Sequence, residues 1–178
     1  MKRLLMIIAF IILLCFTLSC QKPVEEGITE EEAKAMADRM LEMWNEGNLA
    51  LVEEFFAPEV VVHYSASPDD LVGFEGVKNW ITSSHTMLPD FNMAFDEVIV
   101  KGNNMVTRWT ATGTNTGPLR TPMGEFPATN KNVRMFGFSL TKVENGKIVE
   151  EWVIYNVLDM MQQLGFTLTP PQPPEEKK

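Results

Sequence analysis

The residues of this sequence that could move a proton lie in segments that read as β-strands. Glu151 and Tyr155 are four residues apart in a strand predicted to begin at Lys147, so their side chains share a face. His63 lies near the end of another predicted strand, residues 60–64. A carboxylate or an imidazole can take a proton from a carbon acid and return it, which typically accelerates such a reaction by about 10²–10⁴-fold. If these groups meet in one pocket, they indicate proton-transfer chemistry.

A hairpin must position Glu151. The dipeptide Asn145-Gly146 predicts a two-residue turn, because both residues tolerate the positive φ that a type I′ turn needs. With Glu144 facing Lys147, Phe138 falls opposite Val153, and two groups of side chains separate onto opposite faces. The face expected to line a pocket holds Phe136, Phe138, Leu140, Glu151, Val153 and Tyr155, and the opposite face holds Met135, Val143, Ile148, Trp152 and Ile154. A sheet that is apolar on both faces must be covered twice, by its own helices and by something else.

Each candidate residue has a structural interpretation beside the functional one. In an apolar wall, Glu151 would have a raised pKa and could act as a base, but near the hairpin end it could lie exposed at the rim. His63 is the second candidate base, or a histidine hydrogen-bonded in a loop. Tyr155 could donate to a ligand carbonyl, or its hydroxyl could be tied to the backbone. Trp80 is either a core residue or a platform for a ligand.

The remaining pattern predicts helices first and strands afterwards. Thr29 and Glu32 form a capping box that opens a helix ended by Gly47, and Asn48 caps a short helix that runs through Phe56. Further segments are predicted as a helix over residues 73–88, strands over 60–64, 91–101 and 105–116, a long loop over 117–132 and a closing helix over 157–164. This order predicts an α+β fold, with helices packed on one face of a curved, mostly antiparallel sheet.

The N-terminus reads as a targeting segment. Lys2 and Arg3 precede an apolar run over residues 4–18, which is shorter than the roughly 20 residues of a membrane-spanning helix. With Ser19 before Cys20, the segment resembles a bacterial lipoprotein signal, although an uncleaved anchor is an alternative. The resemblance implies cleavage before Cys20 and acylation of that residue, and Gln21 favours the outer membrane within a bacterial envelope. The expected organisation is a signal peptide at 1–19, a tether at 20–28, a domain at 29–168 and a disordered tail at 169–178.

The net charge and the cysteine content argue against several classes of binding partner. The net charge is −9, and cleavage before Cys20 would remove two basic residues and leave −11, from 13 basic and 24 acidic residues. Such a surface argues against binding to nucleic acid or anionic lipid. Both cysteines, Cys15 and Cys20, lie in or beside the leader, so we expect no disulfide and no cysteine metal site in the domain. The histidine spacing matches no metal motif, and we expect no cofactor.

Several sequence patterns together resemble one family. They are WNEGNLALVEEFFAPEVVVH at residues 44–63, TRWTATGTNTG at 107–117, PATNKNV at 127–133, and ENGKIVEEW and QQLG further on. In this order, over residues 29–168, they resemble the SnoaL-like polyketide cyclases of the nuclear transport factor two-like superfamily. The resemblance implies a cone-shaped α+β barrel with a pocket between helices and concave sheet, commonly dimeric through the outer sheet face. It also implies ring closure by an intramolecular aldol step, with an acidic residue as acid/base and no cofactor or metal.

The sequence departs from that family pattern at the acid. The family's acidic position falls on Val153, a second acidic position falls on Asn156, and valine cannot carry a proton. We therefore expect a domain that binds a small apolar or amphipathic molecule, in a pocket whose predicted lining is Trp80, Phe136, Phe138, Val153, Tyr155 and Asn156. One alternative is a cofactor-free cyclase or isomerase that uses Glu151 or His63 as its acid/base. The other is a dimeric scaffold whose cavity is filled by its own side chains.

Overall fold

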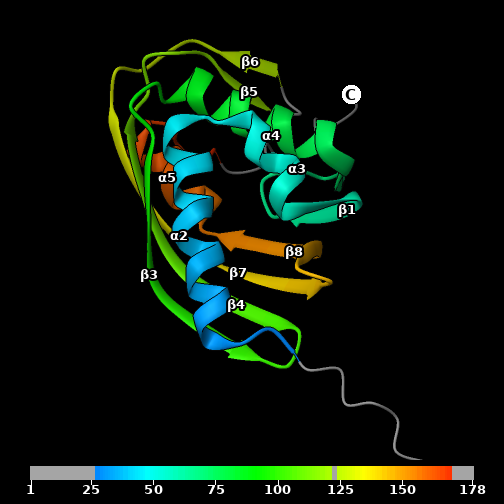
Figure 1. Ribbon diagram of the computed structural model, residues 1–178. Coiled ribbons are helices and arrows are strands. Elements are labelled where there is room, and N and C mark those ends of the chain that lie inside the picture. The colour runs from blue at the N-terminus through cyan, green and yellow to red at the C-terminus, as the bar shows by residue number, and fades with distance from the viewer. Residues whose placement is uncertain (1–26, 122–123, 170–178) are drawn as a thin grey trace, which may run out of the picture.

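The computed structural model describes residues 27–121 and 124–169 (Figure 1). The predicted signal peptide, Cys20 and most of the predicted tether and tail lie outside the described residues. Within the described ranges, no helix combines the length and the apolar composition that crossing a membrane requires.

The first helix begins and ends as the sequence predicts. Helix α2 (Glu30–Glu46) opens with a capping box, in which the Glu32 N–H donates to Thr29 Oγ1 at 3.2 Å and the Thr29 N–H donates to the Glu32 carboxylate at 2.9 Å. It ends at Gly47, whose φ of 64° is left-handed. Asn48 then caps the 3₁₀ turn η1 (Leu49–Leu51), which continues into α3 (Val52–Phe55).

One curved six-stranded sheet forms the body of the domain. Its strands, in the order in which they lie side by side, are β2 (Leu71–Val72), β1 (Phe56–Tyr64), β8 (Lys147–Tyr155), β7 (Asn132–Glu144), β4 (Asn104–Thr114) and β3 (Asn92–Lys101). Only the β1–β8 pair is parallel, which confirms the expectation of a mostly antiparallel sheet. The predicted barrel is not closed, because β2 and β3 remain as separate edges.

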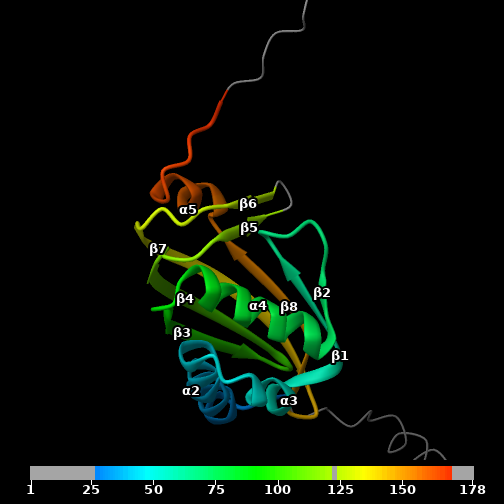
Figure 2. The same ribbon diagram turned by 90° about the horizontal axis from the view of Figure 1, so that it is seen from above.

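The helices cover one side of this sheet. Helix α2 packs against β3, and α4 (Gly73–Met87) packs against β1 and β2. The short helix α5 (Val157–Gln163) follows β8 directly and packs against β7. Figure 2 shows α2, α3 and α4 in front of the sheet, with no helix of the described chain behind it. The other face of the sheet is therefore left bare.

The predicted loop over residues 117–132 contains a small hairpin that the sequence analysis missed. Strands β5 (Leu119–Thr121) and β6 (Gly124–Phe126) pair with each other and with no other strand. Asn115, which is fully buried, holds the base of this excursion: its amide donates to the Gly117 carbonyl at 2.7 Å, and its carbonyl oxygen accepts from the Thr129 N–H at 2.8 Å. The many prolines, glycines and polar residues of this segment hid two such short strands.

A β-bulge changes the predicted register of the main hairpin. The turn has the expected form, with φ of 51° at Asn145 and 72° at Gly146, and Glu144 pairs with Lys147. Val143 then pairs with Ile148 but Lys142 pairs with Glu150, so one extra residue, Val149, bulges out of β8. Beyond the bulge, every residue of β7 faces a β8 residue one place later than predicted.

The predicted faces are correct for the part of β8 beyond the bulge but wrong for Ile148 and for most of β7. Glu151, Val153 and Tyr155 point to the concave side as predicted, and so does Met135, which had been placed outside. Phe136, Phe138 and Leu140, predicted to line the pocket, lie on the outer face. Val143 and Ile148, predicted on the outer face, are buried. Because side chains alternate along a strand, a single extra residue is enough to exchange the two faces.

Candidate functional site

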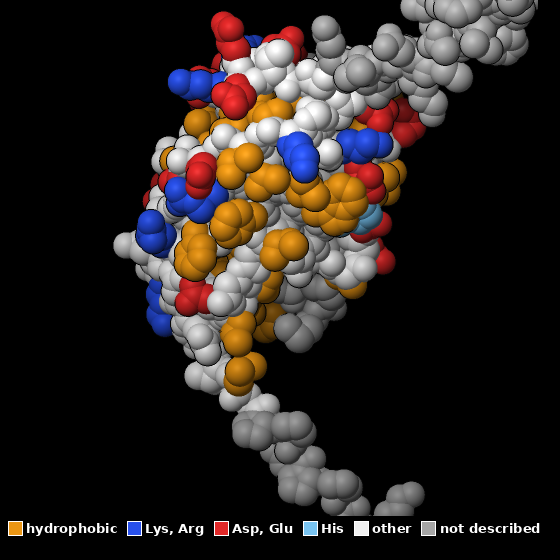
Figure 3. Space-filling view, turned by 90° about the horizontal axis from the view of Figure 1, so that it is seen from below, with side chains coloured by type: hydrophobic (Ala, Val, Ile, Leu, Met, Phe, Trp, Pro, Cys, Tyr) orange, Lys and Arg blue, Asp and Glu red, His pale blue; other side chains and the backbone are white. Residues whose placement is uncertain are grey.

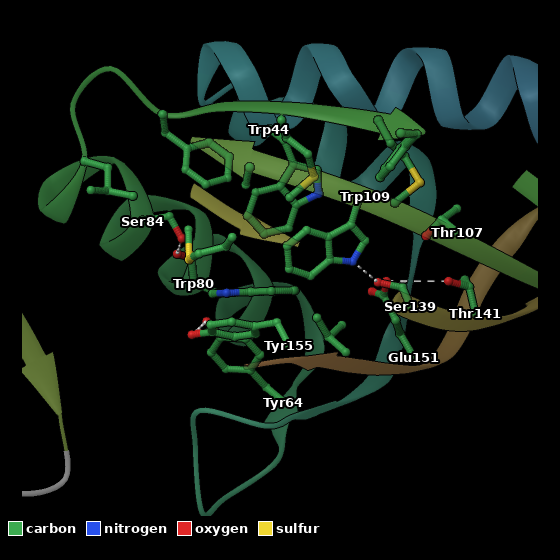
Figure 4. Close-up of a pocket in the computed structure, with 18 of the residues that line it drawn as sticks. Trp44, Tyr64, Trp80, Ser84, Thr107, Trp109, Ser139, Thr141, Glu151 and Tyr155 are labelled. Carbon is green, nitrogen blue, oxygen red and sulfur yellow. Dashed lines mark hydrogen bonds between the residues drawn. The ribbon is translucent and has the colours of Figure 1, made fainter. Parts of the chain in front are cut away.

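A chamber lies between the concave face of the sheet and helices α2 and α4 (Figure 4). Its cavity volume is about 60 Å³, several times the roughly 10–15 Å³ that one water needs. Most of the lining is aromatic or thioether side chains: Trp44, Trp80, Trp109, Tyr64, Tyr155, Phe91, Phe95, Met40, Met87, Met93, Met105, Met135 and Met160. The chamber is thus narrow and apolar, and it is not completely filled.

Glu151 is the one carboxyl group among the residues that line the chamber, and it is 5% exposed. Its Oε1 accepts a long hydrogen bond of 3.5 Å from Thr141 Oγ1, and the Ser139 hydroxyl also hydrogen-bonds to the carboxyl group. Trp109 Nε1 donates to Ser139 Oγ at 3.2 Å, so an indole, two hydroxyls and a carboxyl form one buried group (Figure 4). This group is the one part that is charged or can become charged near neutral pH, in a chamber whose lining is mostly apolar.

Burial changes the proton affinity of Glu151. Removal of the carboxyl group from water raises its pKa from 4.5 to about 7, and the hydrogen bonds from Ser139 and Thr141 offset part of that effect. Both the protonated and the ionised form are therefore populated near neutral pH. A group with such a pKa, enclosed in a pocket, is suited to general acid–base chemistry.

The wall beside Glu151 continues along β8. Val153 is 2% exposed and lies in the chamber wall, so the family's acidic position is an apolar contact here. Tyr155 follows, with its hydroxyl 3.1 Å from that of Tyr64. Trp80 lies on the helix side of the chamber and packs edge-on against Trp44, with ring centroids 4.5 Å apart. The predicted lining residues Trp80, Val153 and Tyr155 are thus brought together.

Three other predicted lining residues lie elsewhere. Phe136 and Phe138 are 57% and 51% exposed on the outer face, because of the bulge in β8. Asn156 lies after the last residue of β8, where its side chain accepts from the Asp159 N–H at 2.9 Å and caps α5. The Asn156 side chain is used to cap the N-terminus of α5. It is therefore not available to bind a ligand in the chamber.

His63 is not in the chamber either, and it does not meet Glu151. Its ring stacks on Trp152 of the outer face, with centroids 5.0 Å apart. Nδ1 lies 2.8 Å from Asp70 and Nε2 lies 3.1 Å from Glu150. The hydrogen bonds to Glu150 and then to Asp70 raise the pKa of His63. The histidine therefore ties the segment after β1 to strand β8.

The hydroxyl groups around Glu151 are a part of the site that the sequence pattern did not indicate. Ser139, Thr141 and Thr107 are all buried in the chamber wall, on β7 and β4. In the stretch from Phe136 to Thr141 apolar and polar residues alternate. Such alternation usually predicts that the apolar side chains are the buried ones. Here the polar set is buried and the apolar set is exposed. A buried acid on the neighbouring strand was the available signal, since a carboxyl group inside a fold needs hydrogen-bonding neighbours.

Strand β4 brings Trp109 into the chamber. The sequence requires Arg108 and Trp109 to point to opposite faces of β4. Arg108 lies outside, paired with Asp96 at 3.1 Å and Glu97 at 3.4 Å, and Trp109 lies in the chamber. The indole lies against Gly137 on β7, where an added Cβ would collide with the ring, so only glycine leaves room for Trp109 at this position.

Helices over the concave face of a curved α+β sheet, with a chamber between them, form the architecture of the nuclear transport factor two-like fold. The chain belongs to the SnoaL-like polyketide cyclase family, whose family model matches residues 34–164. No protein of curated function matches the sequence.

Solved structures share the fold at low sequence identity. TsrD from Streptomyces laurentii is 22% identical with a TM-score of 0.68, over 78% of this chain and 98% of that one. A candidate SnoaL-like polyketide cyclase from Jannaschia sp. CCS1 is 19% identical with a TM-score of 0.67, over 85% and 98%. AclR, a candidate hydroxylase from Streptomyces galilaeus, is 21% identical with a TM-score of 0.66, over 81% and 91%. The names of these neighbours thus cover more than one chemistry, as is usual for a shared fold.

Proposed function

We propose that the domain binds a small, mainly apolar molecule in the chamber and that Glu151 forms a hydrogen bond with a polar group of that molecule. The observation that carries this proposal is a single buried carboxyl group at one end of an otherwise apolar wall. Ligand sites commonly combine an apolar lining with a few polar groups that fix orientation. The chamber is neither wide open nor filled, which favours a binding site over a scaffold with a solid core.

The methionines of the lining allow a ligand larger than the resting space. Six of them line the chamber, contributed by α2, α4, three strands and α5. An unbranched thioether side chain has three rotatable bonds and repacks at low cost. Occupation by a ligand would then displace methionine side chains while the sheet stays in place.

Native mass spectrometry of the purified protein tests the proposal. We expect a bound species of small mass, at one per domain, that is released when the protein unfolds. The variant Glu151→Ala, which removes the carboxyl group, should retain less of it, and the surface variant Glu59→Ala should retain as much as the wild type. Bare polypeptide in every preparation, together with failure to take up small aromatic probes, would remove the proposal.

A second candidate function is acid–base catalysis by Glu151, of the cofactor-free cyclase or isomerase kind. The pKa of about 7 favours it, because a base must release its proton as readily as it takes one. Glu151 lies two residues before Val153 on the same face, about 7 Å along the strand at about 3.3 Å per residue. A substrate could thus contact an acid at position 151 in place of one at position 153. With a substrate in hand, Glu151→Gln should lower kcat by about 10²–10⁴-fold with a smaller change in KM.

We also propose that the domain is held at a bacterial envelope through acylated Cys20, with the outer membrane favoured by Gln21. The support is the sequence of the leader alone. Replacement of Cys20 by alanine should leave the protein in the soluble fraction and should remove the lipid mass from its N-terminal peptide. An unchanged membrane fraction would contradict the anchor.

The outer sheet face supports a further proposal, a homodimer formed through that face. The exposed apolar residues there are Phe136, Phe138, Leu140, Ile154 and Ile99, on strands β7, β8 and β3. Figure 3 shows hydrophobic side chains gathered across the face that lies away from the helices. Patches of this kind on soluble domains commonly mark an interface.

A further inference from the structure

A second hollow lies next to the chamber, and we name it the vestibule. It offers about 180 Å³ to water-sized spheres between the second half of α4, the β5–β6 hairpin and α5. Exposed residues of its lining, Ser83, Thr86 and Arg120, show that it opens to the surface. Glu151 does not line the vestibule, and Figure 4 shows it across the chamber from Tyr64 and Tyr155, which line both hollows.

Six residues line both hollows and form the partition between them: Tyr64, Trp80, Ser84, Met87, Tyr155 and Met160. A molecule that reaches Glu151 from the vestibule must pass these side chains. Of the hydroxyls in the partition, that of Ser84 already donates to the Trp80 carbonyl inside helix α4, at 3.0 Å. The polar character of the partition therefore comes mainly from its two tyrosines, which are the only tyrosines of the chain.

The two tyrosine hydroxyls carry two donor hydrogens, and only one of these has a strong acceptor in the described part of the chain. The hydroxyls lie 3.1 Å apart, so one hydroxyl donates to the other, in either direction. The Trp80 indole donates to Tyr64 and so adds another donor to the pair. The second hydroxyl hydrogen has, among the described residues, only the Met160 thioether near Tyr155, with O···S at 3.8 Å. Sulfur of this kind is a weak acceptor, so the pair offers a donor to a better one.

The neighbourhood keeps both hydroxyls protonated. Burial raises the pKa of Tyr64, and burial followed by the adjacent Tyr64 raises the pKa of Tyr155. The partition therefore presents a neutral O–H donor at any physiological pH. The matching group on a ligand is an acceptor oxygen, such as that of a ketone or an ester.

We propose that the Tyr64–Tyr155 hydroxyl pair is a second anchor, which donates to a carbonyl oxygen at the vestibule end of the ligand while Glu151 holds a polar group at the other end. Tyr155 lies four residues from Glu151, about 13 Å along the strand at about 3.3 Å per residue, with Val153 between them. The ligand class is thus an elongated, mainly apolar carbonyl compound with a polar group at each end. This inference rests on the proposed binding function.

A series of flat probes separates the two anchors. Naphthalene carries no polar group, 2-naphthol carries a hydroxyl, 2-acetylnaphthalene carries a ketone, and 6-acetyl-2-naphthol carries both at opposite ends. Affinities would be measured on the whole purified protein by competition against the fluorescence of 6-acetyl-2-naphthol. A net hydrogen bond is worth about 0.5–1.5 kcal/mol, so we expect 2-acetylnaphthalene to bind about 2–10-fold more tightly than naphthalene. The probe with both groups should bind most tightly.

Phenylalanine variants then test the assignment to the tyrosines. Either tyrosine alone could still donate, so the double variant Tyr64→Phe/Tyr155→Phe is decisive, and the single variants show which hydroxyl faces the ligand. The double variant removes both partners of the Tyr64–Tyr155 hydrogen bond and keeps the shape of the rings, but it also removes the acceptor of the Trp80 indole. We therefore expect it to fold with a somewhat lower melting temperature, and circular dichroism would confirm that it is folded. The double variant should bind naphthalene as the wild type does and should lose the preference for 2-acetylnaphthalene. Thr112→Val, which removes an exposed hydroxyl outside the chamber, should keep that preference.

Three results of these measurements would contradict the proposed second anchor. A preference for the ketone that survives in the double variant overturns the second anchor and leaves the proposed binding function standing. Equal affinity of the wild type for naphthalene and 2-acetylnaphthalene also overturns it, and this measurement needs no variant. If none of the four probes binds, naphthalene included, the binding function fails and the inference fails with it.

Discussion

Glu151 is held in a wall that raises its pKa, and this has a consequence for stability. The folded protein keeps the proton of Glu151 up to about pH 7, whereas the unfolded chain loses it near 4.5. Between these values the unfolded state is the first to ionise, so the free energy of unfolding falls as the pH rises and levels off above about 7. The full effect corresponds to about 3 kcal/mol, at about 1.4 kcal/mol per pKa unit.

Glu151→Gln should remove this pH dependence. The quantity to compare is the melting temperature of the variant minus that of the wild type. We expect this difference to be more positive at about pH 8 than at about pH 5, because glutamine does not ionise. Thermal unfolding at both pH values measures it. Glu59→Gln, on the exposed side of β1, removes the same charge outside the chamber and should show no such change. A difference that is the same at both pH values for Glu151→Gln would mean that the carboxyl group is not buried in solution.

His63 should behave in the opposite sense. Its pKa is raised by Glu150 and Asp70, so its contribution to stability is complete below the unfolded-state pKa of about 6.5 and is lost as the pH rises through the folded-state value. His63→Gln should therefore lower the melting temperature more at about pH 5.5 than at about pH 8.5. If His63 acted as a base in the chamber instead, ligand binding would change in this variant, and we expect it to stay as in the wild type.

At the scale of elements, the bulge at Val149 decides which residues reach the chamber. Val149 is the extra residue, since Ile148 pairs with Val143 and Glu150 pairs with Lys142. Deletion of Val149 would join these two pairs into a regular ladder and would leave Glu151 opposite Thr141. An extra residue placed beyond Glu151 would instead turn Val153 and Tyr155 to the outer face.

Two variants of β8 therefore should differ sharply. The protein that lacks Val149 should fold with the near-ultraviolet circular dichroism of the wild type, at a loss of about 1–3 kcal/mol, because the pairing with β1 is also disturbed. Insertion of one alanine between Glu151 and Trp152 should abolish cooperative unfolding. A deletion variant that is unfolded beside an insertion variant that is folded would show that the register described for β8 is wrong.

At the scale of the whole molecule, the outer face of the sheet carries exposed apolar side chains. The helices of the described residues lie on the other side of the sheet, and four exposed apolar residues of β7 and β8 lie together on this outer face (Figures 2 and 3). A second copy of the chain would bury them without affecting the chamber, because the chamber and this face lie on opposite sides of the sheet. Dimerisation and ligand binding are thus expected to be separable.

Phe138→Glu tests the dimer. It places a charge at the centre of the apolar patch, so we expect the wild type to have the mass of a dimer by light scattering and the variant to have that of a monomer. Leu168→Glu changes a residue that is 72% exposed and outside the sheet, and it should leave the dimer intact. A wild-type monomer, or a variant with an unchanged dimer mass, would remove the proposal.

Much of the fold could be predicted because its signals are local. The capping box at Thr29, the left-handed stop at Gly47 and the type I′ turn at Asn145-Gly146 each depend on a few neighbouring residues. The order of helices and strands followed from such signals, and so did the α+β class. The same patterns were sufficient for a resemblance to the family that matches residues 34–164.

The site depended on contacts that no short stretch of sequence specifies. Alternation along β7 suggested that Phe136 and Phe138 point inward, and one bulged residue on the neighbouring strand reversed this. The burial of Ser139 and Thr141 beside Glu151, and the position of His63 between Asp70 and Glu150, likewise arise from strands that meet only in the folded chain. The sequence by itself thus determined most of the elements, apart from the β5–β6 hairpin, and the inward direction of Glu151, Val153 and Tyr155. Only the tertiary structure decided their neighbours, because register and burial are set by pairing between distant segments.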